Sequence, residues 1–343
     1  MVERKYFQKP MIVDKISSKK DLEELWNSID WPAVRECVFR QQCRIARAAE
    51  EGRLSDVLRL QEELTGSDEA KALAVKEVTQ RKSRDMPGVD GVLWKTSAEK
   101  MYVAFHLNEE GYTALPLRRF YLPKESGTMR PIGIAAMNDR AMQMLYSYAL
   151  QPVAETLGDP HSFGYRLFRS AKDACTAIRN FLGRQAGDVW VLDADITGCF
   201  DNISHNWLLK HIPLRREYLR QVLKSGYIYC GRYFRISRGV PQGGIISPIL
   251  ANMTLDGLEP ALMETFGRSC STFGLTETQK PRLLFVRYAD DFIVLSSSRS
   301  VVEDAWDETN AFLKPRGLCL SEEKTPGRFD PGRVRFPALA VPK

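Results

Sequence analysis

The segment LLFVRYADDFIVL, residues 283–295, contains two apolar runs that are joined by Ala-Asp-Asp. Runs rich in Leu, Phe, Val and Ile favour β-strands, so the segment predicts a hairpin with Asp290 and Asp291 at the mouth of a core. Two buried carboxylates repel each other, and a divalent cation would offset that repulsion. A solvated Asp-Asp turn is the simpler alternative.

A second apolar run, VWVLDADI at 189–196, also ends in acidic residues. Asp193 and Asp195 would point to the same face of a strand, because side chains alternate along it. A third carboxylate beside Asp290 and Asp291 would complete a set of hard oxygen ligands of the kind that Mg²⁺ prefers. Two such ions can hold the attacking and leaving oxygens of a phosphoryl displacement. The carboxylates therefore predict metal-dependent phosphoryl transfer.

The composition limits the classes of protein to which this prediction can apply. The 343 residues are 44% hydrophobic and 27% charged, which excludes a mostly disordered chain, and the net charge of +6 permits nucleic-acid binding without proving it. The apolar runs are too short to span a membrane, and the first ten residues contain no apolar signal core. Seven scattered cysteines without a CxxC pair favour reduced thiols in a cytosol over a disulfide framework or a zinc site.

Periodicity and turn signals predict the remaining elements. We expect strands on either side of a turn within 115–134, a helix that begins at Ser247-Pro248, and further helices at 21–29, 32–52, 54–64, 68–80, 138–154, 171–182 and 301–314. On the helix at 32–52, Arg40, Arg44 and Arg47 share one stripe beside the apolar face. The stripe is either a solvated surface or a phosphate-contacting face.

Six motifs, in order along the chain, resemble those of reverse transcriptases. They are LPKESGTMRPIGI (122–134), HSFGYRLFRS (161–170), DADITGCFDNI (193–203), RGVPQGGIISPILANM (238–253), YADD (288–291) and LCLSEEKT (318–325). The similarity covers about residues 22–325 and is greatest to the bacterial group II intron reverse transcriptase/maturase branch.

The resemblance implies an α+β fold of the right-hand fingers–palm type, with an antiparallel palm sheet. The expected domains are a helical N-terminal extension (1–85), fingers (86–190), a palm with part of the fingers (191–325), and an irregular tail (326–343). The tail lacks the family's strand-and-turn pattern, so the thumb is expected to be absent.

The resemblance also assigns catalytic roles. Asp195, Asp290 and Asp291 match the ligands of two Mg²⁺ ions, and the Ile196 carbonyl would be a further ligand. Asp193 does not match a ligand. Lys324 matches the lysine proposed as general acid toward pyrophosphate.

Further positions match the family's nucleotide-binding residues. They are Arg118, Lys124 and Arg130 for the triphosphate, Phe200 beneath the sugar, and Gln242 and Gly243 in a loop packed on the nucleotide. Without the motifs, the basic residues would be read as solvated surface and Phe200 as an ordinary core residue.

The resemblance implies an RNA-directed DNA polymerase of the bacterial cytoplasm that is associated with a group II intron. Its partners would be an RNA template, which could be its own intron RNA, a DNA or RNA primer, dNTPs, and a protein that supplies the thumb; no membrane is expected. Two alternatives remain open: a non-polymerising RNA-binding maturase or scaffold module, and a domesticated defence or CRISPR-associated reverse transcriptase.

Overall fold

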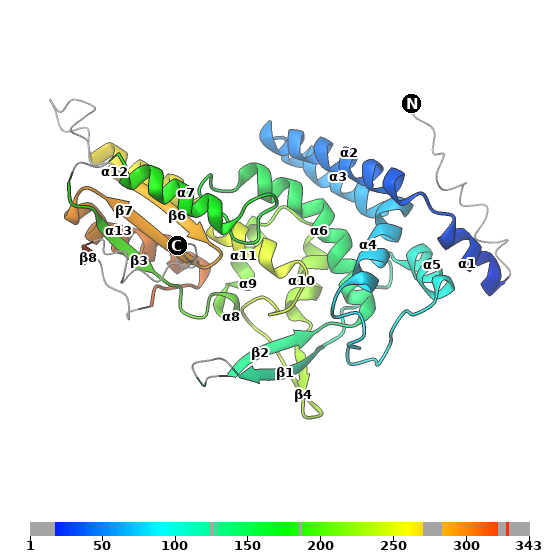
Figure 1. Ribbon diagram of the computed structural model, residues 1–343. Coiled ribbons are helices and arrows are strands. Elements are labelled where there is room, and N and C mark those ends of the chain that lie inside the picture. The colour runs from blue at the N-terminus through cyan, green and yellow to red at the C-terminus, as the bar shows by residue number, and fades with distance from the viewer. Residues whose placement is uncertain are drawn as a thin grey trace. The chain divides into compact units, whose positions relative to one another are not determined.

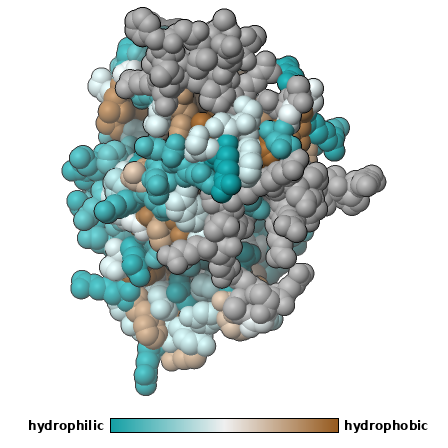
Figure 2. All heavy atoms as spheres, turned by 90° about the vertical axis from the view of Figure 1, so that its left-hand side faces the viewer, coloured by the Kyte–Doolittle hydropathy of each residue, from teal (hydrophilic) through white to brown (hydrophobic). Residues whose placement is uncertain are grey.

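The computed structural model describes residues 18–123, 127, 129–184, 187–269, 283–321 and 327–328. The chain divides into two compact units, each built from separate stretches of sequence. The first unit comprises Met1–Thr156, His211–Ser237 and Pro241–Ser247, and the second comprises Leu157–Lys210, Arg238–Val240 and Pro248–Lys343. Within the described residues no helix is both long and apolar enough to cross a membrane. On the face drawn in Figure 2, hydrophobic residues lie in scattered patches among hydrophilic ones.

The first unit begins with the helices that periodicity predicted. They are α1 (Lys19–Asn27), α2 (Trp31–Glu50), α3 (Leu54–Gly66) and α4 (Asp68–Gln80). The side chains of Ser18, Asp30 and Ser67 accept backbone N–H bonds in the first turns of α1, α2 and α4. The apolar stripe of α2 is buried, as expected. A fifth helix, α5 (Ser97–His106), starts with a capping box that the sequence analysis overlooked.

A four-stranded sheet in the order β2-β1-β4-β5 completes the first unit (Figure 1). The predicted strand–turn–strand is confirmed as β1 (Leu117–Pro123) paired antiparallel with β2 (Met129–Ile134). The unforeseen hairpin of β4 (Tyr227–Tyr229) and β5 (Arg232–Phe234) joins β1 through a parallel pairing. Two helices of this unit are α6 (Met137–Leu157) and α10 (Arg216–Lys224).

The core beside this sheet contains a buried carboxyl group. The Tyr112 hydroxyl donates to Asp139 of α6 at 2.7 Å, and the Leu115 amide donates to its other oxygen at 3.2 Å. Burial raises the pKa of Asp139 to about 6, although both hydrogen bonds oppose the shift. Tyr146 of α6 stacks on Tyr218 of α10 with ring centroids 3.6 Å apart, which fixes the two helices against each other.

The second unit is built on an antiparallel sheet in the order β6-β7-β3-β8 (Figure 1). Its strands are β6 (Leu283–Tyr288), β7 (Asp291–Ser296), β3 (Trp190–Ala194) and the short β8 (Gly327–Arg328). Its helices are α7 (Ala171–Leu182), α8 (Cys199–Asn202), α9 (His205–His211), α11 (Ser247–Leu255), α12 (Leu258–Ser269) and α13 (Arg299–Leu313), the last followed by a 3₁₀ turn at Lys314–Arg316.

Helix α7 covers one face of this sheet. Its residues Ala174, Cys175 and Ile178 form a buried cluster with side chains such as Val286 and Ile293. Helix α13 packs against β3 and β7. A helix-backed antiparallel sheet is the α+β arrangement expected from the sequence.

Candidate active site

The hairpin of β6 and β7 turns at the acidic motif. Tyr288 and Asp291 form the last strand pair, so only Ala289 and Asp290 make the turn, and Asp291 already belongs to β7. Ala289 adopts a positive φ of 61°, a conformation that favours glycine at the first position of a tight hairpin turn. Both aspartates are half-buried. The turn is held by strand pairing on both sides, and the binding of a cation by Asp290 and Asp291 stays a prediction beside the solvated alternative.

The second acid-ended strand lies directly beside this hairpin. Strand β3 pairs antiparallel with β7, and the register ends at Ala194 opposite Phe292. The next residue toward the turn on each strand is Asp195 and Asp291, respectively. Sheet pairing thus brings the two acidic segments, separated by about a hundred positions in sequence, to the same end of one sheet.

The charges of Asp195 and Asp290 both act on the thiol of Cys199. Cys199 begins α8 and is buried, and burial raises the pKa of its thiol to about 12. The charges of Asp290 and Asp195 raise this pKa further, whereas Arg287 lowers it. Both carboxylates therefore lie within electrostatic reach of one thiol.

The donor set suits a hard divalent cation, because it consists of carboxylate oxygens. Across the part of the chain that the structure describes, no three His, Cys, Asp or Glu side chains converge closely enough to form a metal-binding group. The backbone around Asp195 is well fixed: its carbonyl accepts from the Ser321 amide at 2.8 Å, and the Thr197 amide donates to Cys319 at 3.1 Å. Both bonds are formed by backbone groups of the residues on either side of Ile196. The Ile196 carbonyl is a predicted metal ligand.

A buried arginine that the sequence analysis did not identify, Arg287, forms a hydrogen bond with the backbone of the β6–β7 turn. Arg287 has no exposed surface, and it forms an ion pair with Asp256. Its Nη1 donates to Asn252 Oδ1 at 2.9 Å and to the Ala289 carbonyl at 3.2 Å. Burial raises the pKa of Asp256 to about 6, and the Arg287 guanidinium opposes this shift. A charged residue within an otherwise apolar strand was the available signal.

The segment 161–170 packs against the same turn. Asn252 Nδ2 donates to the Gly164 carbonyl at 2.9 Å, and the Phe163 amide donates to the Arg287 carbonyl at 2.9 Å. A Cβ atom at Gly164 would lie 2.9 Å from both Ala289 Cα and the Tyr288 carbonyl carbon, and nearer still to the Ala289 nitrogen. Only glycine fits this close approach of two backbones.

Phe200 lies in α8, close to the acidic end of the sheet. Its half-buried ring meets Tyr165 edge-on, with centroids 6.3 Å apart. Its carbonyl accepts from the Val240 amide at 2.7 Å, and a Cβ at Gly239 would lie 2.8 Å from that oxygen. These contacts fix the backbone of Phe200; its role beneath a sugar remains a prediction.

In the first unit, two of the predicted nucleotide-binding residues, Arg118 and Arg130, share one face of the sheet. Arg118 pairs with Ile134 and Leu122 with Arg130, so side-chain alternation places Arg118 and Arg130 on the same face. The Gly133 amide donates to the Gln242 carbonyl at 2.9 Å. A Cβ at Gly243 would lie 2.8 Å from the Gly133 carbonyl oxygen, so the 242–243 loop packs against β2.

Three further predictions concern basic residues at other places. Lys124 and Lys324 lie outside the described residues. In the stripe on α2, Arg40 pairs with Glu36 at 2.8 Å and Arg44 with Glu63 at 3.2 Å. Arg47 is exposed. Such surface pairs are weak and do not prevent contact with phosphates, so both interpretations of the stripe stay open.

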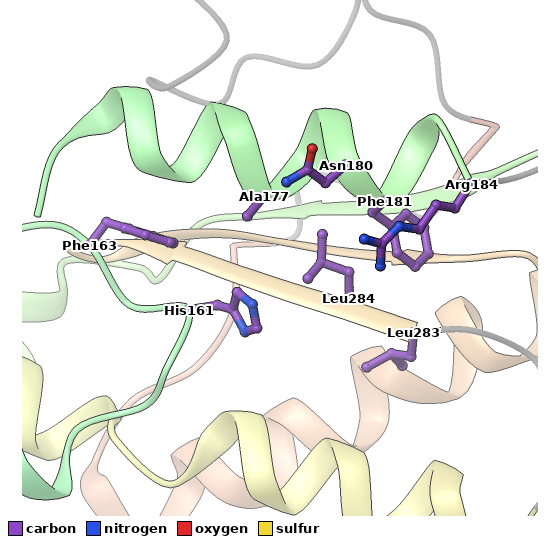
Figure 3. Close-up of a pocket in the computed structure, with 8 residues that line it drawn as sticks. All are labelled: His161, Phe163, Ala177, Asn180, Phe181, Arg184, Leu283 and Leu284. Carbon is purple, nitrogen blue, oxygen red and sulfur yellow. The ribbon is translucent and has the colours of Figure 1, made fainter.

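A cavity of about 710 Å³ in the second unit lies beside α7 and β6 (Figure 3). His161 and Phe163 line one part, and Phe181 and Arg184 line another. None of the acidic residues at the hairpin turn contributes to its lining.

Two segments of the chain match known protein families. Residues 122–336 match the family described as "Reverse transcriptase (RNA-dependent DNA polymerase)". The chain belongs to the reverse transcriptase family. Residues 26–107 match the family described as "N-terminal domain of reverse transcriptase". The predicted family and fold class are thus confirmed. The matched domain is that of an RNA-directed DNA polymerase, as predicted. Dependence on a divalent metal is general in this family.

Curated relatives include intron-encoded proteins. Protein YkfC of Escherichia coli is 31% identical over 74% of this chain and 75% of its own length. The group II intron-encoded protein LtrA of Lactococcus lactis is 34% identical over 46% of this chain, and the putative COX1/OXI3 intron 1 protein of Saccharomyces cerevisiae is 27% identical over 66%. The alignments cover only 27% and 32% of those two longer relatives.

Among solved structures, the telomerase of Candida albicans aligns with 65% of this chain and 44% of its own. The sequence identity is 15% and the TM-score is 0.42.

Proposed function

We propose that this chain is an RNA-directed DNA polymerase that extends a primer 3′-OH with dNTPs, in association with a group II intron. The observation that carries the proposal is the strand pairing that brings Asp195, Asp290 and Asp291 to one end of an antiparallel sheet. Membership of the reverse transcriptase family supports the same activity.

The carboxylates of Asp195, Asp290 and Asp291, with the Ile196 carbonyl, would hold two Mg²⁺ ions. Bound ions of this kind neutralise the charge that develops on the phosphoryl oxygens during an in-line displacement. The residues of the chain would have different roles. The sheet would hold the carboxylates in place, and the triphosphate would be contacted by Arg118, Lys124 and Arg130. Lys324 would give a proton to the leaving pyrophosphate.

The remaining contacts would select and orient the nucleotide. The ring of Phe200 would exclude a 2′-hydroxyl by steric clash, and Gln242 with Gly243 would pack on the sugar or template. The expected partners are an RNA template, a DNA or RNA primer and dNTPs. The expected location is the bacterial cytoplasm.

A primer-extension assay on an RNA template with dNTPs and Mg²⁺ tests the proposal. Asp195→Asn and Asp290→Asn should abolish incorporation while the circular dichroism spectrum stays unchanged, because the amide is a poor substitute for a carboxylate ligand. The matched control is Asp193→Asn, which changes a carboxylate on β3 two positions before Asp195. This variant should retain activity. Extension by the Asp290→Asn protein at the parent rate would refute the metal assignment. Absence of extension by the parent protein, with or without an added thumb fragment, and with RNA binding intact, would favour the non-polymerising scaffold.

A further inference from the structure

The sheet of the first unit presents aromatic and basic side chains on the face opposite Arg118 and Arg130. The side chains of two residues that are paired on neighbouring strands point to the same face of the sheet. The register pairs Leu117 with Tyr227, and Tyr227 with Phe234. Side-chain alternation then places six residues together: Arg119, Tyr121, Tyr227, Tyr229, Arg232 and Phe234. We call this set the aromatic face.

The rings of the aromatic face are already ordered by contacts among themselves. The Arg119 guanidinium lies 3.7 Å above the Tyr227 ring, and Tyr227 stacks on Phe234 with centroids 5.0 Å apart and planes 12° from parallel. Tyr121 meets Tyr229 edge-on at 5.1 Å. Rings that are held in place lose little conformational entropy when a flat ligand stacks on them.

Three of the six side chains, those of Tyr229, Arg232 and Phe234, are exposed, and the other three are half-buried. Tyr229 and Phe234 each expose 39% of their surface, and Arg232 is exposed as well. The hairpin turn between β4 and β5, Cys230-Gly231, has positive φ at both residues, as in a tight type I′ turn. A short hairpin that exposes aromatic rings needs an explanation beyond packing of its own core.

The charge of the sheet indicates what it binds. The strands β1, β2, β4 and β5 contain four arginines and no acidic residue: Arg118, Arg119, Arg130 and Arg232. Flat apolar rings beside guanidinium groups complement a ligand that carries both planar bases and phosphates. Proteins bind single-stranded nucleic acid with this combination, because every base has a face that can stack. An ordinary apolar protein partner would not require the excess of positive charge.

We propose that the aromatic face binds an unpaired RNA strand by base stacking on Tyr229 and Phe234, with phosphates held by Arg119 and Arg232. Three of its four rings are tyrosines, whose hydroxyls can form hydrogen bonds with the 2′-hydroxyl that distinguishes RNA from DNA. This surface is separate from Arg118 and Arg130, which are assigned to the triphosphate and lie on the opposite face of the same sheet. The binding does not depend on polymerisation.

Fluorescence anisotropy with a labelled 12-residue oligo(U), measured without dNTPs, tests the proposal. We expect the Tyr229→Ala/Phe234→Ala protein to bind at least about tenfold more weakly, because each stacked base contributes substantially to such complexes. The dependence of affinity on salt should stay the same in this variant, since no charge is lost. Arg232→Gln should reduce the slope of log affinity against log salt by about 0.7.

Three controls make the outcome decisive. Tyr102→Ala removes an aromatic ring that is 55% exposed on α5 and should leave binding unchanged. Asp290→Asn should bind oligo(U) like the parent, so failure of polymerisation and failure of this surface are distinguishable. Tyr229→Phe keeps the ring and removes the hydroxyl, so it should retain stacking but narrow the difference in affinity between oligo(U) and oligo(dT).

Several results would overturn the proposal. Unchanged affinity of the double variant, with an unfolding temperature equal to that of the parent, would remove the stacking role. Equal affinity for a blunt RNA duplex would show that unpaired bases are not recognised. Tighter binding of oligo(dT) than of oligo(U) would refute the choice of RNA.

Discussion

Gly164→Ala should disturb the acidic turn without changing any acidic residue. The added methyl carbon would lie 2.9 Å from Ala289 Cα and from the Tyr288 carbonyl carbon, and both neighbours are backbone atoms that cannot rotate away. The Ala289 nitrogen would lie closer still, so restoring ordinary van der Waals contact requires the two backbones to separate by about 1 Å or more. The φ of Gly164 is not in the positive region, so the expected effect comes from space alone and not from backbone strain.

The magnitude follows from two general relations. Inserting a methyl group into a packed site costs about 1–3 kcal/mol of the free energy of unfolding. A misplacement approaching an ångström at reacting groups lowers the rate by about a hundredfold, so a loss of about tenfold or more in incorporation is expected here. Urea denaturation measures the first effect, and single-nucleotide incorporation at saturating Mg²⁺ measures the second.

Gly187→Ala is the matched control. It lies in the same unit, and no atom comes within 4 Å of a Cβ built there. This variant should keep both the parent stability and the parent rate. If Gly164→Ala also keeps both, the close packing of segment 161–170 on the turn has no role in positioning Asp290, and the reasoning above is wrong.

Three other predictions follow from the same structure. Phe200→Val should raise the ratio of ribonucleotide to deoxyribonucleotide incorporation, measured on folded protein, whereas an unchanged ratio with lower stability would make Phe200 a core residue. Replacing Arg40, Arg44 and Arg47 together by Ala should weaken binding to structured RNA and make its salt dependence shallower; an identical slope would assign the stripe to solvated surface. Burial raises the pKa of Asp139 to about 6, so the folded state retains this proton to a higher pH than the unfolded chain, and stability should fall as pH rises from about 4 to about 6. Asp139→Asn should remove that fall, of about 3 kcal/mol, from denaturation curves recorded at pH 4 and pH 7, and parallel pH profiles of the two proteins would contradict it.

The sequence predicted those elements whose signals are local. The hairpin at 283–295 and the strand before Asp195 were predictable because long apolar runs end abruptly in acid. The helices α2 and α4 were predictable because a capping residue precedes an apolar period in each. Helix α5 carried a comparable signal in Thr96 and Glu99, which was missed.

The support beneath the turn could not be predicted in the same way. Arg287 stands out in its strand, but its partners Asn252 and Asp256 are 35 and 31 residues away. Such pairs are fixed by tertiary packing, and nothing in a single sequence specifies which residues will meet. The β4–β5 hairpin was missed for another reason: its strands have three residues each, too few for a clear alternation of apolar and polar positions.

The division of the chain into interleaved stretches has a consequence for its synthesis. The polypeptide passes between the two units five times, and the last piece of the first unit is Pro241–Ser247. The first unit therefore cannot be completed on the ribosome until Ser247 has emerged, by which time Leu157–Lys210 of the second unit has emerged as well. Neither half can be obtained by cutting the gene once. A chaperone that delays collapse should raise the yield of folded protein more than a lower rate of translation at any single position.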